Sequence, residues 1–198
     1  MLSDTHRLIA HNVFKVLQSE LNIDVDYDSL RHGSVAPDIY PTMMFMSHSM
    51  KGSIGLVHEY IDSLYNNAVP DDRKGVEKFS YRLGVLVHFT SDYFCKAHNE
   101  KRYNNLVLHY LYERKLKRHF DKHIRNYKPF VGLIKPGDWG VAGSIKDFIR
   151  EKHNEYCGLE RSMSNDVMYS IGVSAIAVLN IVAHCVKNTN GGHLRKIA

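Results

Sequence analysis

Residues 85–98 read VLVHFTSDYFCKAH and place two histidines and an aspartate in an otherwise apolar segment. His88 and Asp92 stand four positions apart, so on a helix their side chains share one face, one turn apart. An imidazole without a polar partner is unfavourable among apolar side chains. The pair is therefore either a core histidine hydrogen-bonded to an aspartate or part of a metal site. Imidazole nitrogen with carboxylate oxygen is a ligand set that suits zinc.

Spacing alone does not decide between these explanations. With 13 histidines in the chain, about two pairs of histidine with Asp, Glu or His at this spacing are expected by chance. The chain has four pairs in which the histidine comes first: His58/Asp62, His88/Asp92, His109/Glu113 and His119/His123. The last lies in the basic segment RKLKRHFDKH, which is typical of a solvent-exposed face, and the first is interpreted as a surface pair.

Helical periodicity dominates the chain and strand alternation is scarce. Helices are predicted over about residues 4–20, 54–67, 69–94, 99–126, 144–156 and 164–187. An irregular stretch is expected over residues 21–42, where Gly33, Pro37 and Pro41 act as breakers, and a second over residues 128–143. The sequence predicts one all-α domain over residues 1–198, a multi-helix bundle with a frayed tail at residues 187–198.

The composition is that of a globular protein, with 44% hydrophobic and 24% charged residues. The net charge of +5 favours anionic partners such as lipid surfaces but is not a nucleic-acid signature. The three cysteines are scattered and argue against a disulfide framework. The first residues lack the pattern of a secretory signal, so a cytoplasmic location is expected.

One stretch resembles a membrane span in composition. Residues 169–186 carry no Asp, Glu, Lys or Arg. Ser170, Ser174, Asn180 and His184 would be costly in lipid, and the stretch is barely long enough to cross a bilayer. A helix buried inside the domain is the favoured interpretation.

The string around residue 88 is longer than one pair. His88-x3-Asp92-x5-His98 is followed by His109-x3-Glu113. This order resembles the central signature of the zinc-dependent phospholipase C family, all-helical bacterial enzymes that share a fold with the S1/P1-type nucleases. The resemblance implies an all-α bundle of the phospholipase C/P1 nuclease type.

Two further stretches fit the same family in the same order. Thr5-His6 matches the Thr-His or Ser-His that opens its first helix. GSVAPD supplies Asp38, and His48 follows ten residues later. The matches span residues 5 to 113.

The resemblance implies two to three zinc ions and assigns ligands to each. The first ion would be held by Asp38, His48, His88 and Asp92. The second would be held by His98, His109 and Glu113, with positions left for water or a substrate oxygen. Asp92 would bridge from the first ion to a third, which His6 also binds. His58 is the alternative to His48, and His11 is the alternative to His6.

This sequence departs from the family at its N-terminal segment. In the secreted members an N-terminal tryptophan chelates the third zinc through its amino group and carbonyl. Here five residues precede His6 and none is tryptophan, so the resemblance leaves the third site incomplete. The chain is shorter than the secreted enzymes and no lipid-binding β-sandwich follows, so toxin-like membrane activity is not implied.

The function that the resemblance implies is zinc-dependent phosphodiester hydrolysis by in-line attack of a metal-activated water. Asp38 would orient that water or accept its proton. The expected substrate is a phospholipid or head-group ester, with transient membrane-surface contact and no stable nucleic-acid partner; the sequence predicts no oligomeric state.

Two alternatives stay open. The first is a nuclease-like phosphodiesterase, in which Tyr40, Phe45, Tyr93 or Trp139 would stack on a base, although a Tyr-rich helical core explains these residues as well. The second is a zinc-stabilised helical domain that binds a partner without catalysis. Structural zinc sites are normally closed by four protein ligands, so the open positions favour an enzyme.

Overall fold

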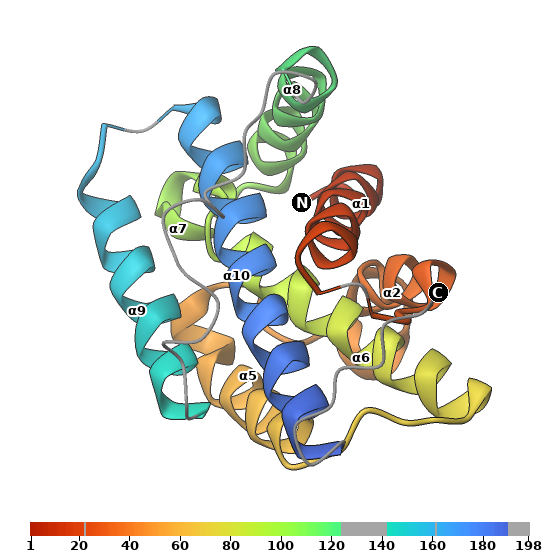
Figure 1. The fold of residues 1–198 in the computed structure, drawn as a ribbon. Coiled ribbons are helices and arrows are strands. Elements are labelled where there is room, and N and C mark those ends of the chain that lie inside the picture. Colours follow the sequence, from red (N-terminus) through yellow and green to blue (C-terminus); the bar gives the residue numbers. More distant parts are fainter. Residues whose placement is uncertain (22, 124–141, 161, 190–198) are drawn as a thin grey trace.

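The computed structural model describes residues 1–21, 23–123, 142–160 and 162–189 (Figure 1). Every regular element within these ranges is helical, which confirms the all-α fold class. The elements are α1 (Ser3–Leu21), α2 (Tyr27–Gly33), α3 (Ala36–Ile39), α4 (Pro41–Met44), α5 (Met50–Tyr65), α6 (Arg73–Asp92), α7 (Lys96–Asn99), the 3-10 helix η1 (Lys101–Asn104), α8 (Leu106–His123), α9 (Ala142–Gly158) and α10 (Met163–Thr189).

The helix α6 is the centre of the bundle. It packs against α1, α2, α5 and α10 (Figure 1). Its N-terminus is capped by the Asp72 side chain, which accepts from the Gly75 N–H. All residues from Leu83 to Asp92 are buried, so the second half of the helix has no solvent-facing side. Its polar residues must therefore find partners inside the protein.

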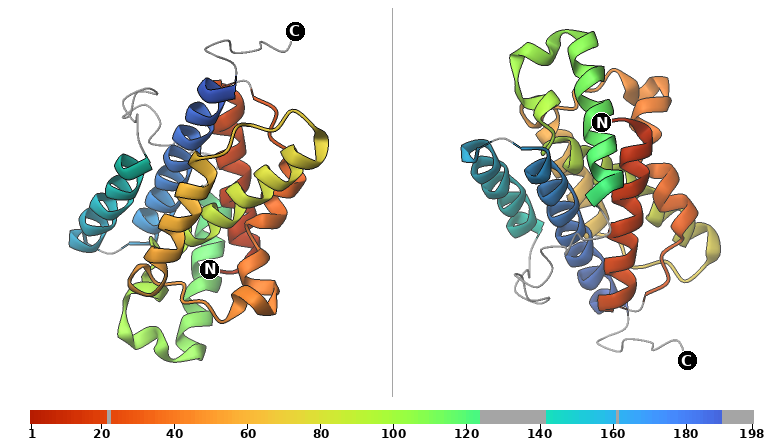
Figure 2. Two further views of the ribbon diagram at one scale, coloured as in Figure 1. Left: turned by 90° about the horizontal axis from the view of Figure 1, so that it is seen from below. Right: turned by 90° about the horizontal axis from the view of Figure 1, so that it is seen from above.

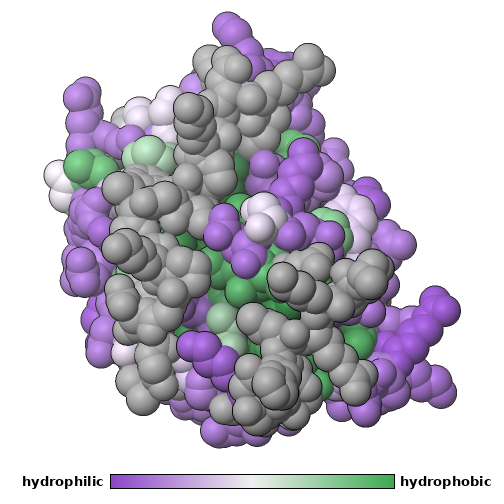
Figure 3. All heavy atoms as spheres, in the orientation of Figure 1, coloured by the Kyte–Doolittle hydropathy of each residue, from purple (hydrophilic) through white to green (hydrophobic). Residues whose placement is uncertain are grey.

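The apolar helix α10 packs on α1, α6 and α9. It is long and apolar enough to cross a membrane over Met163–Lys187, but 89% of its most apolar window is buried inside the molecule. In Figure 3 residues coloured as hydrophobic are visible near the centre of the face, over α10. This burial agrees with the predicted core helix.

The prediction of an irregular stretch over residues 21–42 is wrong in part, because α2 and α3 lie within it and α4 begins in it. Asp26 caps α2 by accepting from the Ser29 N–H. Pro37 and Pro41 lie at the starts of α3 and α4. Proline is well suited to the first turn of a helix, where its missing N–H would have no partner. The two prolines therefore start short helices in this chain.

Gly33 on α2 and Gly84 on α6 allow the backbones of these helices to touch. A Cβ on Gly33 would lie 2.0 Å from the Tyr81 carbonyl oxygen, and one on Gly84 would lie 2.1 Å from the Leu30 carbonyl oxygen. Backbone atoms cannot move away as a flexible side chain would, so no larger residue fits without separating the helices.

We expect Gly84→Ala to lower the free energy of unfolding by about 1 to 3 kcal/mol, because the added methyl group overpacks the helix contact. Denaturant unfolding followed by circular dichroism measures this. The matched control is Gly55→Ala on α5, where a Cβ meets nothing within 4 Å. That change should stabilise the helix slightly. Equal effects of the two substitutions would contradict the close-approach argument.

Other predicted boundaries also change. The second helix begins at Met50 instead of residue 54, and the single helix predicted over residues 99–126 is divided into α7, η1 and α8. The Asn105 side chain accepts from the N–H groups of Val107 and Leu108 and so begins α8. The break lets the chain turn between His98 on α7 and His109 on α8.

Several predictions fall partly on residues that the structure does not describe. The expected loop over residues 128–143 lies outside the described residues except for Ala142 and Gly143, with which α9 begins. The expected frayed tail over residues 187–198 is wrong for its first three residues, because α10 continues to Thr189. Residues 190–198 and Trp139 lie outside the described ranges.

Candidate metal centre

The predicted ligands come from five helices and one loop. His6 lies on α1, Asp38 on α3, His48 after α4, His88 and Asp92 on α6, His98 on α7, and His109 and Glu113 on α8. Both panels of Figure 2 place the α3–α4 segment and the α7–η1 segment at the same end of the bundle, on either side of the N-terminus. The structure brings all eight side chains into one continuous cluster, within 4 Å of one another from neighbour to neighbour. Their roles as ligands stay predictions.

Asp92 is the centre of this cluster, and its carboxylate is wholly buried. Its two oxygens face different histidines. Oδ1 lies 3.4 Å from His6 Nε2 and 3.3 Å from His98 Nε2. Oδ2 lies 2.8 Å from His48 Nδ1 and 3.3 Å from His88 Nε2. Each oxygen of this carboxylate faces its own pair of imidazole nitrogens, an arrangement suited to a carboxylate that bridges two metal ions.

The buried histidines are oriented through their second nitrogen atoms. His88 Nδ1 donates to the Ser34 carbonyl oxygen at 2.9 Å, which directs Nε2 toward the cluster. Ser34 is the residue after Gly33, where the backbones of α2 and α6 touch. His6 Nδ1 lies 3.1 Å from Ser91 Oγ, and Ser91 Oγ in turn donates to the His88 carbonyl oxygen. Such contacts set the tautomer and ring direction of metal-binding histidines.

The first donor group joins Asp38, His48 and His88, whose potential ligand atoms lie within 4.8 Å of one another. His88 Nε2 lies 3.7 Å from Asp38 Oδ1 and 3.1 Å from His48 Nδ1. A second group, with the same limit, joins His6, His88 and Asp92. His6 stacks on His88 with ring centroids 3.9 Å apart, so the two groups adjoin.

The third donor group lies at the start of α7 and on α8, and His109 borders it. His109 Nε2 lies 2.7 Å from Glu113 Oε1, and His98 Nε2 lies 3.4 Å from the same oxygen. His109 Nδ1 is 3.3 Å from the Tyr103 carbonyl oxygen, to which it donates. Cys95, which the sequence analysis did not single out, lies in the same group with His98 and Glu113. Its position three residues before His98 was the only signal in the sequence.

Burial and charge set the protonation of the cluster. Burial, with the neighbouring His6, holds the pKa of His88 well below its ordinary value, so its imidazole is neutral. Burial alone would raise the pKa of Asp92, but His98, the N-terminal ammonium and His6 outweigh it and hold that pKa well below its usual range. The pKa of Glu113 is likewise lowered, mainly by the N-terminal ammonium and His109 against the effect of burial. His88 as a neutral imidazole, with Asp92 and Glu113 as carboxylates, is in the form that binds metal, whereas the hydrogen bond to Glu113 raises the pKa of His109.

The α-amino group of Met1 also lies in the cluster, which the sequence analysis did not anticipate. It donates to Asp92 Oδ1 at 2.6 Å and lies 3.1 Å from Glu113 Oε1. Burial lowers the pKa of this ammonium, but Asp92 and Glu113 outweigh it and raise the pKa to about 12. The only signal in the sequence was the N-terminal amino ligand of the family that it resembles.

The cluster is buried at one side and open at the other. The side chains of His6, His88 and Asp92 are fully buried. Those of Asp38 and His109 are 24% and 25% exposed, and that of His48 is 16% exposed. Burial raises the pKa of the Asp38 carboxyl, with His6 opposing. A ligand from solvent therefore reaches the cluster past Asp38, His48 and His109.

The alternative histidines lie elsewhere. His11 borders a surface groove of about 390 Å³ between α1, α2 and α8, and its Nδ1 faces the Tyr27 hydroxyl at 3.2 Å. His58 lies on α5, where Lys146 and Asp62 are among its charged neighbours. Neither belongs to a donor group among the described residues. His119 Nε2 faces Ser164 Oγ at 3.1 Å.

Asp166 fixes the helices that carry the third donor group. It is buried and accepts from the hydroxyls of Tyr112 and Tyr156, each at 2.7 Å. It also accepts from the Lys96 N–H at 3.1 Å. These contacts tie α7, α8 and α9 to the start of α10, and Tyr112 directly precedes Glu113. Nothing in the local sequence around Asp166 indicated this role.

The side chains present fit zinc. The cluster supplies imidazole nitrogens and carboxylate oxygens, the ligand types that zinc prefers. His6 Nε2 is buried and has no hydrogen-bond partner, although Asp92 Oδ1 faces it at 3.4 Å. A cation between these two atoms would satisfy a nitrogen that is otherwise costly to bury.

Comparison with known proteins gives one match. A family model described as zinc dependent phospholipase C matches residues 5–163. That range includes all eight residues of the cluster. No curated protein and no solved structure matches the chain.

Proposed function

This chain belongs to the zinc-dependent phospholipase C family, and from that premise we propose that it hydrolyses a phosphodiester of a phospholipid or head-group ester. Family membership supports a phospholipase C-like hydrolase that depends on zinc. The substrate, the number of ions and the residue roles are our proposal.

The observation that carries the proposal is the way in which four histidines are divided between the two oxygens of Asp92. One oxygen faces His48 and His88, the other faces His6 and His98, and the cluster opens to solvent at Asp38 and His109. A purely structural zinc site would be closed by protein ligands and would need no such opening. We therefore favour the enzyme over a zinc-stabilised binding domain.

The chemistry divides between the ions and the side chains. Zinc bound here would lower the pKa of a coordinated water and offset the charge on the phosphate oxygens. Asp38, at the open edge, orients the attacking water and accepts its proton. The fully buried Asp92 holds its negative charge among imidazoles, and His88 is kept neutral with Nε2 directed inward. His48 and His109 border the opening through which the phosphate enters.

The nuclease-like alternative loses part of its support. Tyr93 is fully buried, and its hydroxyl lies 3.0 Å from Ser53 Oγ, so its ring does not reach a base. The Tyr40 hydroxyl faces His32 at 2.9 Å. Phe45 alone of the described candidates is mostly exposed.

Metal analysis combined with a soluble diester assay tests the proposal. We expect the purified protein to contain at least two zinc ions per chain and to hydrolyse bis(p-nitrophenyl) phosphate. Chelation should abolish turnover and added zinc should restore it. Zinc content without hydrolysis would favour the binding domain, and fewer than two ions would contradict the cluster. A comparison of phosphatidylcholine with single-stranded DNA then separates lipid from nucleic-acid substrates.

For a protein whose chain begins at Met1, we propose that the α-amino group serves the third ion together with His6 and Asp92. Binding would release a proton from the ammonium. An extension of Gly-Ser before Met1 converts the amine to an amide in a site without room for it, and should lower the metal content by one ion per chain. The same extension after Ala198 is the control. Unchanged metal content in the first protein would contradict this role.

The cytoplasmic location and the absence of a stable nucleic-acid partner stay predictions. Cell fractionation tests the first, and the DNA comparison above tests the second.

A further inference from the structure

Large exposed apolar side chains are concentrated in two segments of the described chain. The first segment carries Ile39, Tyr40, Met44 and Phe45, and the second carries Leu106, Val107, Leu108, Tyr110 and Leu111. The only other residue of this kind among the described residues is Leu159. We call the nine residues of the two segments the apolar rim.

The rim is unusually exposed for side chains of this size. Phe45 is 87% exposed, Leu106 is 82% exposed and Val107 is 66% exposed. Single exposed apolar residues are ordinary on protein surfaces, but gathered ones mark contact sites for proteins, ligands or membranes. The rim is therefore a candidate interaction surface.

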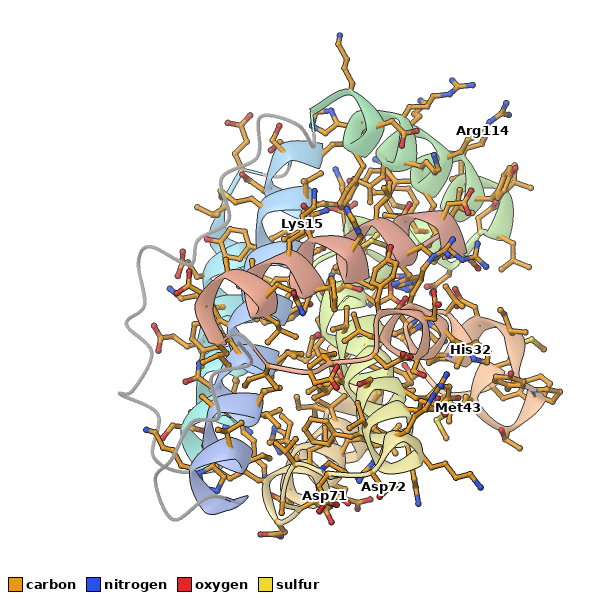
Figure 4. The ribbon with its side chains drawn as sticks, turned by 45° about the vertical axis from the view of Figure 1, so that its right-hand side comes forward. Lys15, His32, Met43, Asp71, Asp72 and Arg114 are labelled. Atoms are coloured by element: carbon orange, nitrogen blue, oxygen red, sulfur yellow. The ribbon has the colours of Figure 1, made fainter. Side chains whose placement is uncertain are left out.

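The rim borders the open side of the metal centre. Asp38 directly precedes Ile39, His48 follows Phe45 by three residues, and His109 lies within the second segment. Figure 4 shows Met43 on α4 and Arg114 on α8 on the same side of the molecule, and Figure 2 places the segments that carry the rim at the end with the N-terminus. A partner that covers the rim therefore also faces the opening at Asp38 and His109.

The charge along the two rim segments is positive, while Glu100, just before the second, pairs with Lys96 and Arg102. Residues 39–52 and 101–112 contain none of the chain's 21 acidic residues. They contain Lys51, Lys101 and Arg102, all exposed. Arg102 covers the Tyr103 ring at 4.7 Å from its centroid. An apolar surface with basic residues beside it is complementary to anionic lipid head groups above acyl chains.

The distribution of apolar residues around the second segment favours a lipid surface as the partner. Its five apolar residues lie at the start of α8 and occupy about 200° of the helix circumference. A partner helix would use a narrower stripe of residues at i, i+3 and i+4 spacing. Lipid head groups and acyl chains can surround a helix end from several sides at once.

We propose that the apolar rim docks on the surface of an anionic phospholipid bilayer and presents a lipid phosphate to the metal centre. The choice of lipid rests on the proposed function, because a phospholipid placed there meets the rim with its acyl chains and the cluster with its phosphodiester. The rim thus selects aggregated lipid over a soluble ester.

Vesicle flotation tests the docking. The zinc-loaded protein is mixed with phosphatidylcholine vesicles that contain phosphatidylglycerol, and the fraction that floats is measured. We expect the triple variant Phe45→Ser, Leu106→Ser, Val107→Ser to bind at least about tenfold less. The matched control Leu159→Ser, on the turn between α9 and α10, should bind as the unchanged protein does. Reversal of charge by Lys101→Glu with Arg102→Glu should reduce binding at least about fivefold.

The outcomes separate docking from catalysis. Hydrolysis of bis(p-nitrophenyl) phosphate should be the same in all these proteins, because none of the substitutions touches the metal centre. Docking is overturned if the unchanged protein does not float, or if both the triple and the charge-reversed variants float as it does. It is also overturned if the triple variant changes the oligomeric state on size-exclusion chromatography, since the rim would then join two copies. Flotation without any hydrolysis would keep the docking surface and reject the proposed activity.

Discussion

Replacement of Asp92 by asparagine should remove most of the bound zinc. Asp92→Asn keeps the size of the side chain but loses the negative charge and turns one oxygen into an amide that cannot bind metal. One oxygen of Asp92 faces His6 and the other faces His48, which belong to different donor groups. The change should therefore affect two ions at once. Loss of a residue that only supports a ligand typically costs 10- to 100-fold in metal affinity, so we expect a loss of at least about 100-fold.

Zinc content by elemental analysis and titration with a competing chelator measure this effect. The chain contains a matched control in Asp62→Asn, since His58/Asp62 has the same spacing as His88/Asp92. Asp62 is 48% exposed and pairs with Lys146, so its replacement should leave the zinc content unchanged. An Asp92→Asn protein with the zinc content of the unchanged protein would contradict the bridging role.

The metal-free Asp92→Asn protein should also be less stable. The Met1 ammonium and the Asp92 carboxylate form a fully buried ion pair at 2.6 Å. Removal of one partner of a buried pair typically costs 3–5 kcal/mol, because it leaves the other charge without compensation. Denaturant unfolding in the presence of chelator measures this cost apart from the metal.

Replacement of Asp38 should have the second large effect, on turnover. Asp38→Asn removes the group that we propose accepts the proton of the attacking water. General base catalysis typically contributes 10²- to 10⁴-fold, so kcat for bis(p-nitrophenyl) phosphate should fall at least about 100-fold. The partial exposure of Asp38 at the open edge of the cluster places it where a water and a phosphate can reach it.

Metal content decides how the Asp38 result is interpreted. If the variant keeps its zinc and loses turnover, the loss belongs to proton transfer or water orientation. If zinc is lost as well, added zinc should restore binding before it restores turnover. Asp28→Asn, at an exposed position on α2, is the control and should have wild-type kcat. An Asp38→Asn protein with normal zinc and normal kcat would contradict the proposed role.

Sequence patterns predicted the longer helices well, because each carries an apolar stripe or a fully apolar run over many residues. The bounds of α1 and α10 differ from the prediction by about one or two residues. The short helices α2, α3 and α4 were missed because they are too short for periodicity to show. Their glycine and prolines carry the opposite signal to the one assumed, since Gly33 serves a helix contact and Pro37 and Pro41 begin helices.

The order of histidines and carboxylates along the chain was enough to propose the cluster. Within one helix, spacing determines which side chains share a face, and His109 with Glu113 follows directly from that rule. The pair His58/Asp62 obeys the same rule and lies outside the cluster. Spacing therefore selects candidates, and the ordered set selected among them only through the family resemblance.

The sequence by itself determined the helical class, the local pairs and the family. Only the tertiary structure decided which oxygen of Asp92 faces which histidine, that the Met1 amine is buried beside it, and that the rim residues of α8 are exposed. These features depend on how α1, which is far away in sequence, packs against α6 and α8. Periodicity acts over a few residues within one helix, whereas burial and distance between helices are set by how whole helices pack.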